Sequence, residues 1–347
     1  MRNAVRHKSQ QGFVLVLTLW ILAAIAIAAA YFGERVQASL RLAAARQNLA
    51  EAQLALSNGR AEALYRLATA GFTSVGLGQP PDVIRLDDSP YAESGGVLQL
   101  QDSGGLLQIN GLPDEFLTRF LATLDVPQER RAPLVDAMRD FADVDDLRRL
   151  NGAESAQYRA IGRTDLPRNQ PFQSSQELRD VLGWADQLEL WRGAGVLDMV
   201  TVQGPIGINP NTAPWQVLTA LDGVTPEIAR TILERRVIQP ITADWLDRML
   251  GTRYDGIPSI VLRFPTGYIR LTQWVPGLPW GHRYNIELTP RGVRAPWKLS
   301  DFYRRERAPA QNPALPPESN PPANASDIPR LPARSALPAS APRLLAN

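Results

Sequence analysis

Apolar residues follow several patterns along the chain, and each pattern predicts a different element. Residues 13–32 are apolar throughout except for Thr18. A helix of this length rises about 30 Å, which matches the hydrocarbon core of a bilayer. Beyond this run, leucines recur every seven residues on one side of an amphipathic helix, at Leu42, Leu49 and Leu56. No proline interrupts residues 34–70, so we predict one continuous helix from the apolar run to about Ala70.

Two later regions alternate apolar and polar residues, which predicts β-strands. Residues 97–102 alternate in this way, and 103–105 then predict a turn into a second strand at 106–110, forming a hairpin. Residues 268–305 alternate in the same way and predict a meander of three antiparallel strands. Residues 113–236, between these regions, have mainly helical character. The pattern therefore predicts an α+β protein whose strands are interrupted by helices.

Composition excludes several classes of site. The chain has 347 residues, 44% hydrophobic and 21% charged, which is typical of a globular protein of two or three domains. It contains no cysteine, which excludes disulfides and thiolate metal sites. Its two histidines, His7 and His282, are far apart in the sequence, which argues against histidine zinc sites and histidine-activated nucleophiles. The sequence also has no phosphate-binding loop or zinc motif, so it does not indicate an enzyme.

Positive charge is concentrated at the N-terminus. Arg2, Arg6 and Lys8 precede Gly12 with no acidic residue among them, and removing them changes the formal net charge from +2 to −1. The positive-inside rule places them in the cytoplasm and the rest of the chain beyond the membrane. A secretory signal peptide is an alternative, because "AIAIAAAYF" offers small-residue cleavage sites, and a plain N-terminal anchor is another. The predicted continuation into a long amphipathic helix argues against the signal peptide.

The basic leader, Gly12, Phe13 and the apolar run together resemble a type IV pilin-like signal. The resemblance implies that a membrane prepilin peptidase cleaves after Gly12 and methylates the new N-terminal residue to N-methylphenylalanine. Most such proteins have glutamate as the fifth mature residue, whereas this chain has Leu17. A carboxylate inside the membrane costs about 2.5–3.5 kcal/mol on insertion scales, and in packed filaments it pairs with a neighbour's N-terminal ammonium. Its absence resembles one family, minor pseudopilin K of type II secretion (general secretion pathway protein K), where it accompanies a position at the filament tip.

Three downstream passages also resemble the protein K family. They are an acidic passage at 134–158, with Phe141 where tryptophan is usual, a Pro-Phe-x-Ser passage at 170–184, and an I-N-x-N-T-A passage at 208–213. At the end of the first strand region only Asn110 matches, and the lysine usual there is absent. The matching positions include Gly152, Ala153, Tyr158, Pro171, Phe172, Ser174, Glu177, Leu178, Asn209, Asn211, Thr212 and Ala213.

Carboxylates cluster in the acidic passage. Asp136, Asp140 and Asp143 follow helical spacing, and like charges so placed destabilise a helix by a few tenths of a kcal/mol per pair. Nearby arginines or a calcium ion could offset this repulsion, and the resemblance implies that family members can carry calcium. The candidate calcium ligands are Asp140, Asp143, Asp145, Asp146 and Glu154. The EF-hand pattern is absent and the resemblance does not assign the ligands, so the sequence favours a capping or solvated acidic patch over a metal site.

Residues 205–236 resemble a helix-hairpin-helix unit around the turn 223–225. Such units often bind DNA phosphates through backbone amides, so a membrane-anchored DNA-binding protein of competence type is the alternative function. However, the turn has one glycine, and three arginines in the unit are balanced by three acidic residues. Phosphate binding without net positive charge loses its main driving force, so we expect no nucleic acid here. The predicted core of the unit comprises Leu218, Leu221, Ile228, Ile232 and Leu233.

The expected fold is α+β, with a pilin-like long N-terminal helix packed on an antiparallel sheet and a large all-helical insertion of the helix-hairpin-helix or SAM-like type. The expected segments are a cleaved leader (1–12), the transmembrane (13–33) and periplasmic (34–72) halves of the helix, the first part of the α/β domain (73–110), the inserted helical domain (111–240), the C-terminal strand meander (241–306) and a disordered tail (307–347). The tail prediction rests on ten of the 29 prolines and no aromatic residue in 308–347.

The resemblance implies a structural role in protein export across the bacterial outer membrane. It places the protein in the inner membrane as a single-pass protein with its C-terminal domain in the periplasm, and at the pseudopilus tip after assembly. The expected partners are minor pseudopilins I and J, then pseudopilin H and the major pseudopilin G, with prepilin peptidase and inner-membrane lipid. A head with a bulky insertion is difficult to stack under an identical subunit, which suits a tip that initiates assembly. This role requires no cofactor, and calcium is the one candidate.

Overall fold

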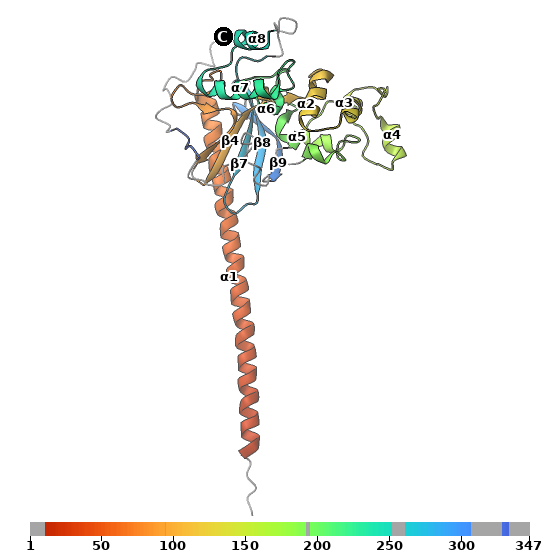
Figure 1. Cartoon of the computed structure of the whole chain (residues 1–347). Helices are drawn as coiled ribbons and strands as arrows, with labels where there is room; N and C mark the ends of the chain where they lie inside the picture. Colours follow the sequence, from red (N-terminus) through yellow and green to blue (C-terminus); the bar gives the residue numbers. More distant parts are fainter. Residues whose placement is uncertain (1–10, 94, 192–194, 252–260, 307–327, 333–347) are drawn as a thin grey trace, which may run out of the picture. The chain divides into compact units, whose positions relative to one another are not determined.

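The computed structural model describes residues 11–93, 95–191, 195–251, 261–306 and 328–332 (Figure 1). The chain divides into two compact units, Met1–Leu54 and Ala55–Asn347. Residues 1–10 of the predicted leader lie outside the described residues. So do residues 307–327 and 333–347 of the predicted tail.

Helix α1, Gln11–Thr69, is continuous over 59 residues, as the absence of proline predicts. Its large apolar side chains from Val14 to Leu49 are exposed. Thr18, the polar residue of the apolar run, donates its hydroxyl hydrogen to the Leu15 carbonyl at 2.9 Å. By length and composition α1 is able to cross a membrane, and no second such helix occurs among the described residues.

The second unit is built around an antiparallel sheet that has five strands among the described residues, in the order β3-β4-β7-β8-β9. The strands are β3 (Asp87–Glu93), β4 (Gly96–Asp102), β7 (Tyr268–Trp274), β8 (Trp280–Leu288) and β9 (Trp297–Glu306). Strands β7, β8 and β9 confirm the predicted meander. A short antiparallel pair, β1 (Gly76–Leu77) and β2 (Ile84–Arg85), precedes the sheet.

The predicted hairpin between residues 97–102 and 106–110 is wrong. Strand β4 pairs with β3 and β7, whereas β5 (Leu107–Gln108) forms a parallel pair with β6 (Val200–Thr201). Between β4 and β5 the chain makes the 3-10 turn η1 (Ser103–Gly105), where the carboxylate of Asp102 accepts a hydrogen bond from the N–H of Gly104 at 3.0 Å. The side chain of Asp102 therefore supports a turn that leaves the sheet, instead of one that returns along β4.

The two faces of the sheet differ, because side chains alternate along each strand. One face is apolar and packs against the last turns of α1. Its core comprises Ala63, Leu64 and Leu67 of α1 with Leu98, Leu100, Ile269, Leu271, Tyr284 and Ile286 of the strands. The other face is polar but also buried, and comprises Gln99, Gln101, Arg270, Thr272, Arg283 and Asn285. This second face must therefore find its hydrogen-bond partners inside the protein.

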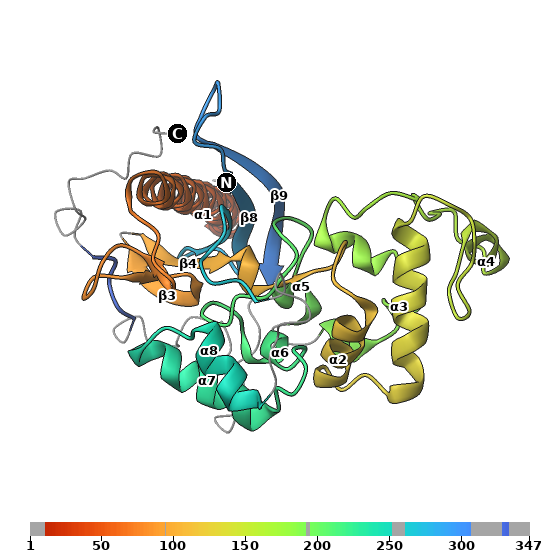
Figure 2. The same ribbon diagram turned by 90° about the horizontal axis from the view of Figure 1, so that it is seen from above.

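Among the described residues between β4 and β7, the regular structure is mainly helical. The helices are α2 (Asp114–Thr123), α3 (Gln128–Ala142), α4 (Ser155–Ala160), α5 (Gly195–Met199), α6 (Trp215–Leu218), α7 (Pro226–Ile238) and α8 (Ala243–Leu250), with 3-10 turns at η2 (Ser175–Arg179) and η3 (Leu188–Trp191). Figure 2 shows α2, α3 and α4 on the β9 side of the unit, opposite β3.

The expected all-helical insertion at 111–240 needs two corrections. Strand β6 lies inside it and pairs with β5, and helical structure continues beyond residue 240 through α8. The side chain of Thr242 caps the start of α8, accepting from the N–H of Trp245, and Gly251 ends it with φ of 66°. These caps explain why the helical region extends further than the sequence pattern predicted.

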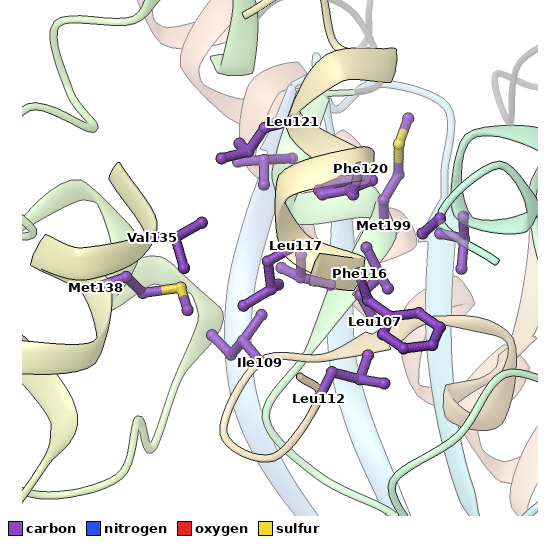
Figure 3. Close-up of a cluster of buried hydrophobic side chains, with 14 of the residues drawn as sticks. Leu107, Ile109, Leu112, Phe116, Leu117, Phe120, Leu121, Val135, Met138 and Met199 are labelled. Atoms are coloured by element: carbon purple, nitrogen blue, oxygen red, sulfur yellow. The ribbon is translucent and has the colours of Figure 1, made fainter. Parts of the chain in front are cut away.

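The helical region has a hydrophobic core of its own (Figure 3). Phe116, Leu117, Phe120 and Leu121 of α2 are all buried and pack among residues from β5, α3 and α5. The predicted core of the helix-hairpin-helix unit is confirmed, with Leu218, Leu221 and Ile232 buried and Ile228 and Leu233 partly buried against the same core.

Part of the predicted tail has a defined place. Residues 328–332 lie beside β3, where Arg330 forms a parallel bridge with Ala92. Ile328 is 6% exposed, and Leu331 packs against the apolar face of the sheet. The prediction of disorder from proline content did not anticipate this segment, because its place depends on pairing with the edge of β3 and on two apolar side chains, Ile328 and Leu331.

Candidate functional site

Gly12 and Phe13 lie in the first turn of α1, which begins at Gln11. Leu17 follows one turn later and its side chain is 49% exposed. No Asp, Glu, Lys, Arg or His occurs between Lys8 and Glu34, so this part of α1 carries no charge. Cleavage after Gly12 and methylation of Phe13 stay predictions.

The five predicted calcium ligands do not converge on one point. Asp140 of α3 is fully buried, and its carboxylate accepts hydrogen bonds from the backbone N–H of Arg149 at 3.1 and 3.3 Å. A Cβ atom on Gly152 would lie 2.0 Å from Oδ2 of Asp140, so glycine is required for this close approach. Asp140 thus anchors the loop that follows α3. Within the described part of the chain, no group of three or more His, Cys, Asp or Glu side chains could hold a metal ion.

Two of the other predicted ligands stabilise local structure. Asp145 accepts a hydrogen bond from the N–H of Leu147 at 2.8 Å. Asp146 accepts one from Nδ2 of Asn169 at 3.1 Å. Asp145 thus shapes a turn in the loop after α3, and Asp146 connects this loop to Asn169.

Glu154 is different, because its carboxylate is buried at the N-cap of α4, where the side chain faces the backbone N–H of Gln157. It is 5% exposed, and neither carboxylate oxygen has a hydrogen-bond partner among the residues that the structure describes. Burial, together with the negative charges of Asp140 and Asp143, raises the pKa of Glu154 to about 7. Oδ1 of Asp143 is also buried without a partner in the described residues. A proton or a cation would therefore stabilise this carboxylate.

The I-N-x-N-T-A passage joins the helical region to the sheet through Asp102. This aspartate is fully buried at the end of β4. It accepts hydrogen bonds from Nδ2 of Asn209 at 3.1 Å and from the hydroxyl of Thr212 at 2.9 Å. It also accepts from the backbone N–H and the hydroxyl of Thr266, both at 2.8 Å. The passage is therefore a structural joint, and Asp102 is its centre.

Two other motif residues are amide clamps. Asn211 is fully buried, and its side chain donates to the carbonyl of Ile241 at 3.1 Å and accepts from its N–H at 2.7 Å. Asn110 makes the same pair of bonds with the backbone of Phe172, at 3.0 and 2.9 Å. Both asparagines hold together segments that are distant in sequence, which gives a physical reason for amide side chains at these positions.

The helix-hairpin-helix unit uses its arginines internally. Arg236 is 7% exposed and forms an ion pair with Asp87 at 3.2 Å. The guanidinium of Arg235 lies over the ring of Trp245, 4.9 Å from its centroid. Since two of its three arginines are engaged in this way, the unit presents little positive charge to a phosphate backbone, and the DNA-binding alternative loses its physical basis.

The polar face of the sheet is anchored by Asp198 of α5, which the sequence reasoning missed. Asp198 forms ion pairs with Arg283 of β8 and Arg305 of β9. Arg305 donates to the two carboxylate oxygens from Nε and Nη2 at 2.8 and 2.6 Å. Burial alone would raise the pKa of Asp198, but the two guanidinium groups outweigh it and hold that pKa at about 2. Arg270 of β7 donates to the backbone carbonyls of Asp198 and Val200.

One signal in the sequence could have revealed this anchor. Arg270, Arg283 and Arg305 occupy the polar positions of three strands, and adjacent strands carrying arginine on one face require carboxylates opposite them if that face is covered. The alternation by itself does not tell whether the polar side of the strands faces solvent or is covered.

Comparison with known proteins gives one family. Residues 97–189 match the family described as "Type II secretion system (T2SS), protein K". No curated protein matches the chain. A similar solved chain comes from the crystal structure of the GspK-GspI-GspJ complex from the type 2 secretion system of enterotoxigenic Escherichia coli. It is 17% identical, with a TM-score of 0.48, and the similarity covers 75% of this chain and 96% of that chain. Residues 97–189 of the present chain are therefore similar to protein K of the type II secretion system.

Proposed function

We propose that this protein is a minor pseudopilin of a type II secretion system that caps the tip of the pseudopilus. In this role α1 anchors it in the inner membrane, and the unit that begins at Ala55 lies in the periplasm. It initiates assembly with minor pseudopilins I and J, ahead of pseudopilin H and the major pseudopilin G. The family match supports the secretion role, and a structural subunit of this kind needs no catalytic centre.

The observation that carries the tip position is the uncharged segment around Leu17. A buried glutamate is tolerated in a pilin-like helix only when a neighbour's N-terminal ammonium neutralises it. A subunit at the tip has no successor whose N-terminus needs such a partner. Leucine at this position avoids the insertion cost of an acid that would have no use there.

Helix α1 offers a surface for partner helices. Leu42 and Leu49, two positions of the predicted leucine repeat, are 53% and 50% exposed. Leucines spaced by seven residues are suited to packing between parallel helices. This surface supports the proposal that α1 bundles with the helices of pseudopilins I and J.

Processing at Gly12 is tested by intact mass spectrometry of the protein purified from cells that contain prepilin peptidase. We expect a mature chain that starts at Phe13 and carries one added methyl group. Gly12→Ala should block cleavage, while Gln10→Ala, two residues away in the same leader, should leave it unchanged. A mature chain that starts near Ala28–Tyr31 would instead identify a secretory signal peptide.

The tip position is tested by labelling the protein in assembled pseudopili. We expect one label at one end of each filament in electron micrographs, and co-purification of the detergent-solubilised protein with pseudopilins I and J. Labels repeated along the shaft would refute the tip position without affecting the similarity to protein K.

We also propose that calcium binds the loop between α3 and α4, since the unpartnered oxygens of Glu154 and Asp143 need a positive charge. Calcium takes six to eight oxygen ligands and favours clustered carboxylates. Binding requires Asp143, Asp145 and Asp146 to close towards Glu154, because no metal-holding group is assembled among the described residues. The ion would neutralise the loop and stabilise it.

Thermal melts of metal-stripped protein test this site. Added calcium should raise the melting temperature of the wild type and of Glu129→Gln, an exposed substitution on α3. It should not raise that of Glu154→Gln. A wild-type protein whose melting temperature is unchanged by calcium would remove the proposal.

A further inference from the structure

Strand β3 lies at one edge of the sheet, and part of that edge is covered by the chain's own C-terminal segment 328–332. The N–H of Ala92 donates to the carbonyl of Pro329 at 2.8 Å, and the carbonyl of Ala92 accepts from the N–H of Leu331 at 3.3 Å. These two bonds make the segment a short parallel strand added to the edge. Figure 2 shows it beside β3 as a short blue stretch.

Side chains also fix the segment in place. Ile328 is 6% exposed and Leu331 packs on the apolar core of the sheet. At the far end, Nη2 of Arg66 donates to the carbonyl of Pro332 at 2.7 Å. Arg66 belongs to the last turns of α1, is 3% exposed, and is oriented by an ion pair with Glu62 at 2.7 Å. A buried arginine aimed at a peptide carbonyl is a recognition contact of the kind that peptide-binding sites use.

The composition of the segment suits a peptide that pairs with the edge strand of a sheet and prevents a further strand from adding to it. Pro329 and Pro332 have no N–H, and the N–H of Leu331 is already used. The segment therefore offers few donors to a further strand, so it covers an edge that would otherwise invite pairing with another chain.

We propose that the edge of β3 and Arg66 form a peptide-binding site of the strand-addition type, and that segment 328–332 is its tethered, exchangeable ligand. The site selects an extended peptide with the pattern apolar-Pro-x-apolar-Pro. The inference is independent of the proposed role in secretion, since it rests on contacts within the second unit alone.

The small number of contacts is the reason for expecting exchange. Among the described residues, the segment makes two backbone hydrogen bonds, one arginine contact and two apolar side-chain contacts, which give modest affinity. Residues 307–327 connect the segment to β9, and a tether of this length supplies an effective concentration on the order of millimolar. The segment therefore occupies the site in the intact chain, whereas cutting the tether should let it dissociate.

The test uses the full chain in detergent, with the recognition sequence of a site-specific protease inserted between residues 307 and 327. After cleavage and gel filtration, the C-terminal fragment should be lost. The remaining protein should then bind a fluorescent synthetic peptide of residues 326–334, measured by polarisation. The uncut protein should bind the same peptide at least roughly tenfold more weakly, because its own segment competes.

Variant peptides distinguish specific binding at this site from nonspecific binding. Leu331→Asp in the peptide should weaken binding by roughly tenfold or more, because it places a charge against the apolar core. Arg330→Ala, at the exposed position next to it, should change binding by less than about twofold. N-methylation at Leu331 should weaken binding by roughly fivefold, since it removes one hydrogen bond.

Three results would overturn the proposal. The cut protein does not bind the peptide at about 1 mM, a concentration of the same order as the one that tethering supplies. The Leu331→Asp and Arg330→Ala peptides bind equally well. The cut protein unfolds when the fragment leaves, which would make the segment an integral part of the fold instead of an exchangeable ligand.

Discussion

Replacing Asp198 with asparagine should strongly destabilise the second unit. Asp198 is the carboxylate that neutralises Arg283 and Arg305 on the polar face of the sheet. The side chains of these three residues are 10%, 1% and 7% exposed. Asparagine keeps the size of the side chain but removes the negative charge. The two guanidinium groups then stay buried without that charge to neutralise them.

The expected magnitude follows from two estimates. A pKa near 2, against the ordinary value of 3.8, corresponds to about 2–3 kcal/mol of stabilisation of the charged carboxylate by the folded state. Removing one partner of a buried ion pair typically costs about 3–5 kcal/mol, because the remaining charge stays buried. We therefore expect the free energy of unfolding of the second unit to fall by about 3–5 kcal/mol.

Urea unfolding of the full chain in detergent, followed by tryptophan fluorescence, measures this change. Asp180→Asn is the matched control, since Asp180 is exposed and lies 4.0 Å from Arg163, and it should change stability by less than about 1 kcal/mol. If Asp198→Asn unfolds at the same urea concentration as the control, the polar face of the sheet is not held by this charge and the reasoning is wrong.

Three further predictions concern other positions. Gly152→Ala should destabilise the protein by about 1–3 kcal/mol, because the added Cβ would lie 2.0 Å from Oδ2 of Asp140. Gly71 has open space around it, so Gly71→Ala should lower the free energy of unfolding far less in the same urea titration. On acidification, the stabilisation from Asp198 should persist down to about pH 4 and be lost between about pH 4 and 2, since its pKa is lowered on folding. Urea unfolding of wild type and Asp198→Asn across this pH range measures the loss. If the difference in their free energies of unfolding does not narrow, the prediction is wrong. In metal-free buffer, Glu154→Gln should be more stable than wild type at pH 8, because folding raises the pKa of this carboxyl. The difference in the free energy of unfolding should shrink as pH falls from about 7 to 4.5. Equal stability at pH 8 would show that the charge of Glu154 does not destabilise the folded protein.

Local patterns predicted the elements whose residues interact mainly with their sequence neighbours. The proline-free stretch gave the continuous helix α1, and alternation gave β7, β8 and β9. The wrong hairpin at 97–110 has a specific cause. The turn at 103–105 is shaped by the carboxylate of Asp102, whose other partners, Asn209, Thr212 and Thr266, are more than a hundred residues further along the chain. No local pattern carries that information.

The candidate sites divide in the same way. Gly12, Phe13 and Leu17 lie within one short stretch of the chain, so the predicted signal could be proposed without a structure. The acidic residues at 140–154 could be found as a group, but their roles could not. Asp140 is an acceptor for backbone N–H groups, whereas Glu154 is buried without a partner in the described residues. Burial separates these two carboxylates, and burial depends on the whole fold.

The sequence by itself determined that this protein has an uncharged membrane-length helix without the usual acid, an α+β fold with an interrupted sheet, and the motifs of one secretion family. Those properties are set by residue order, chain composition and local periodicity. Only the tertiary structure decided that the polar face of the sheet is buried against α5, that the motif asparagines are clamps, and that a short part of the proline-rich tail covers the edge of β3. Each of these three features depends on contacts between segments that are distant in the sequence. Whether a polar side chain is solvated or forms an ion pair is decided by the segment that packs over it.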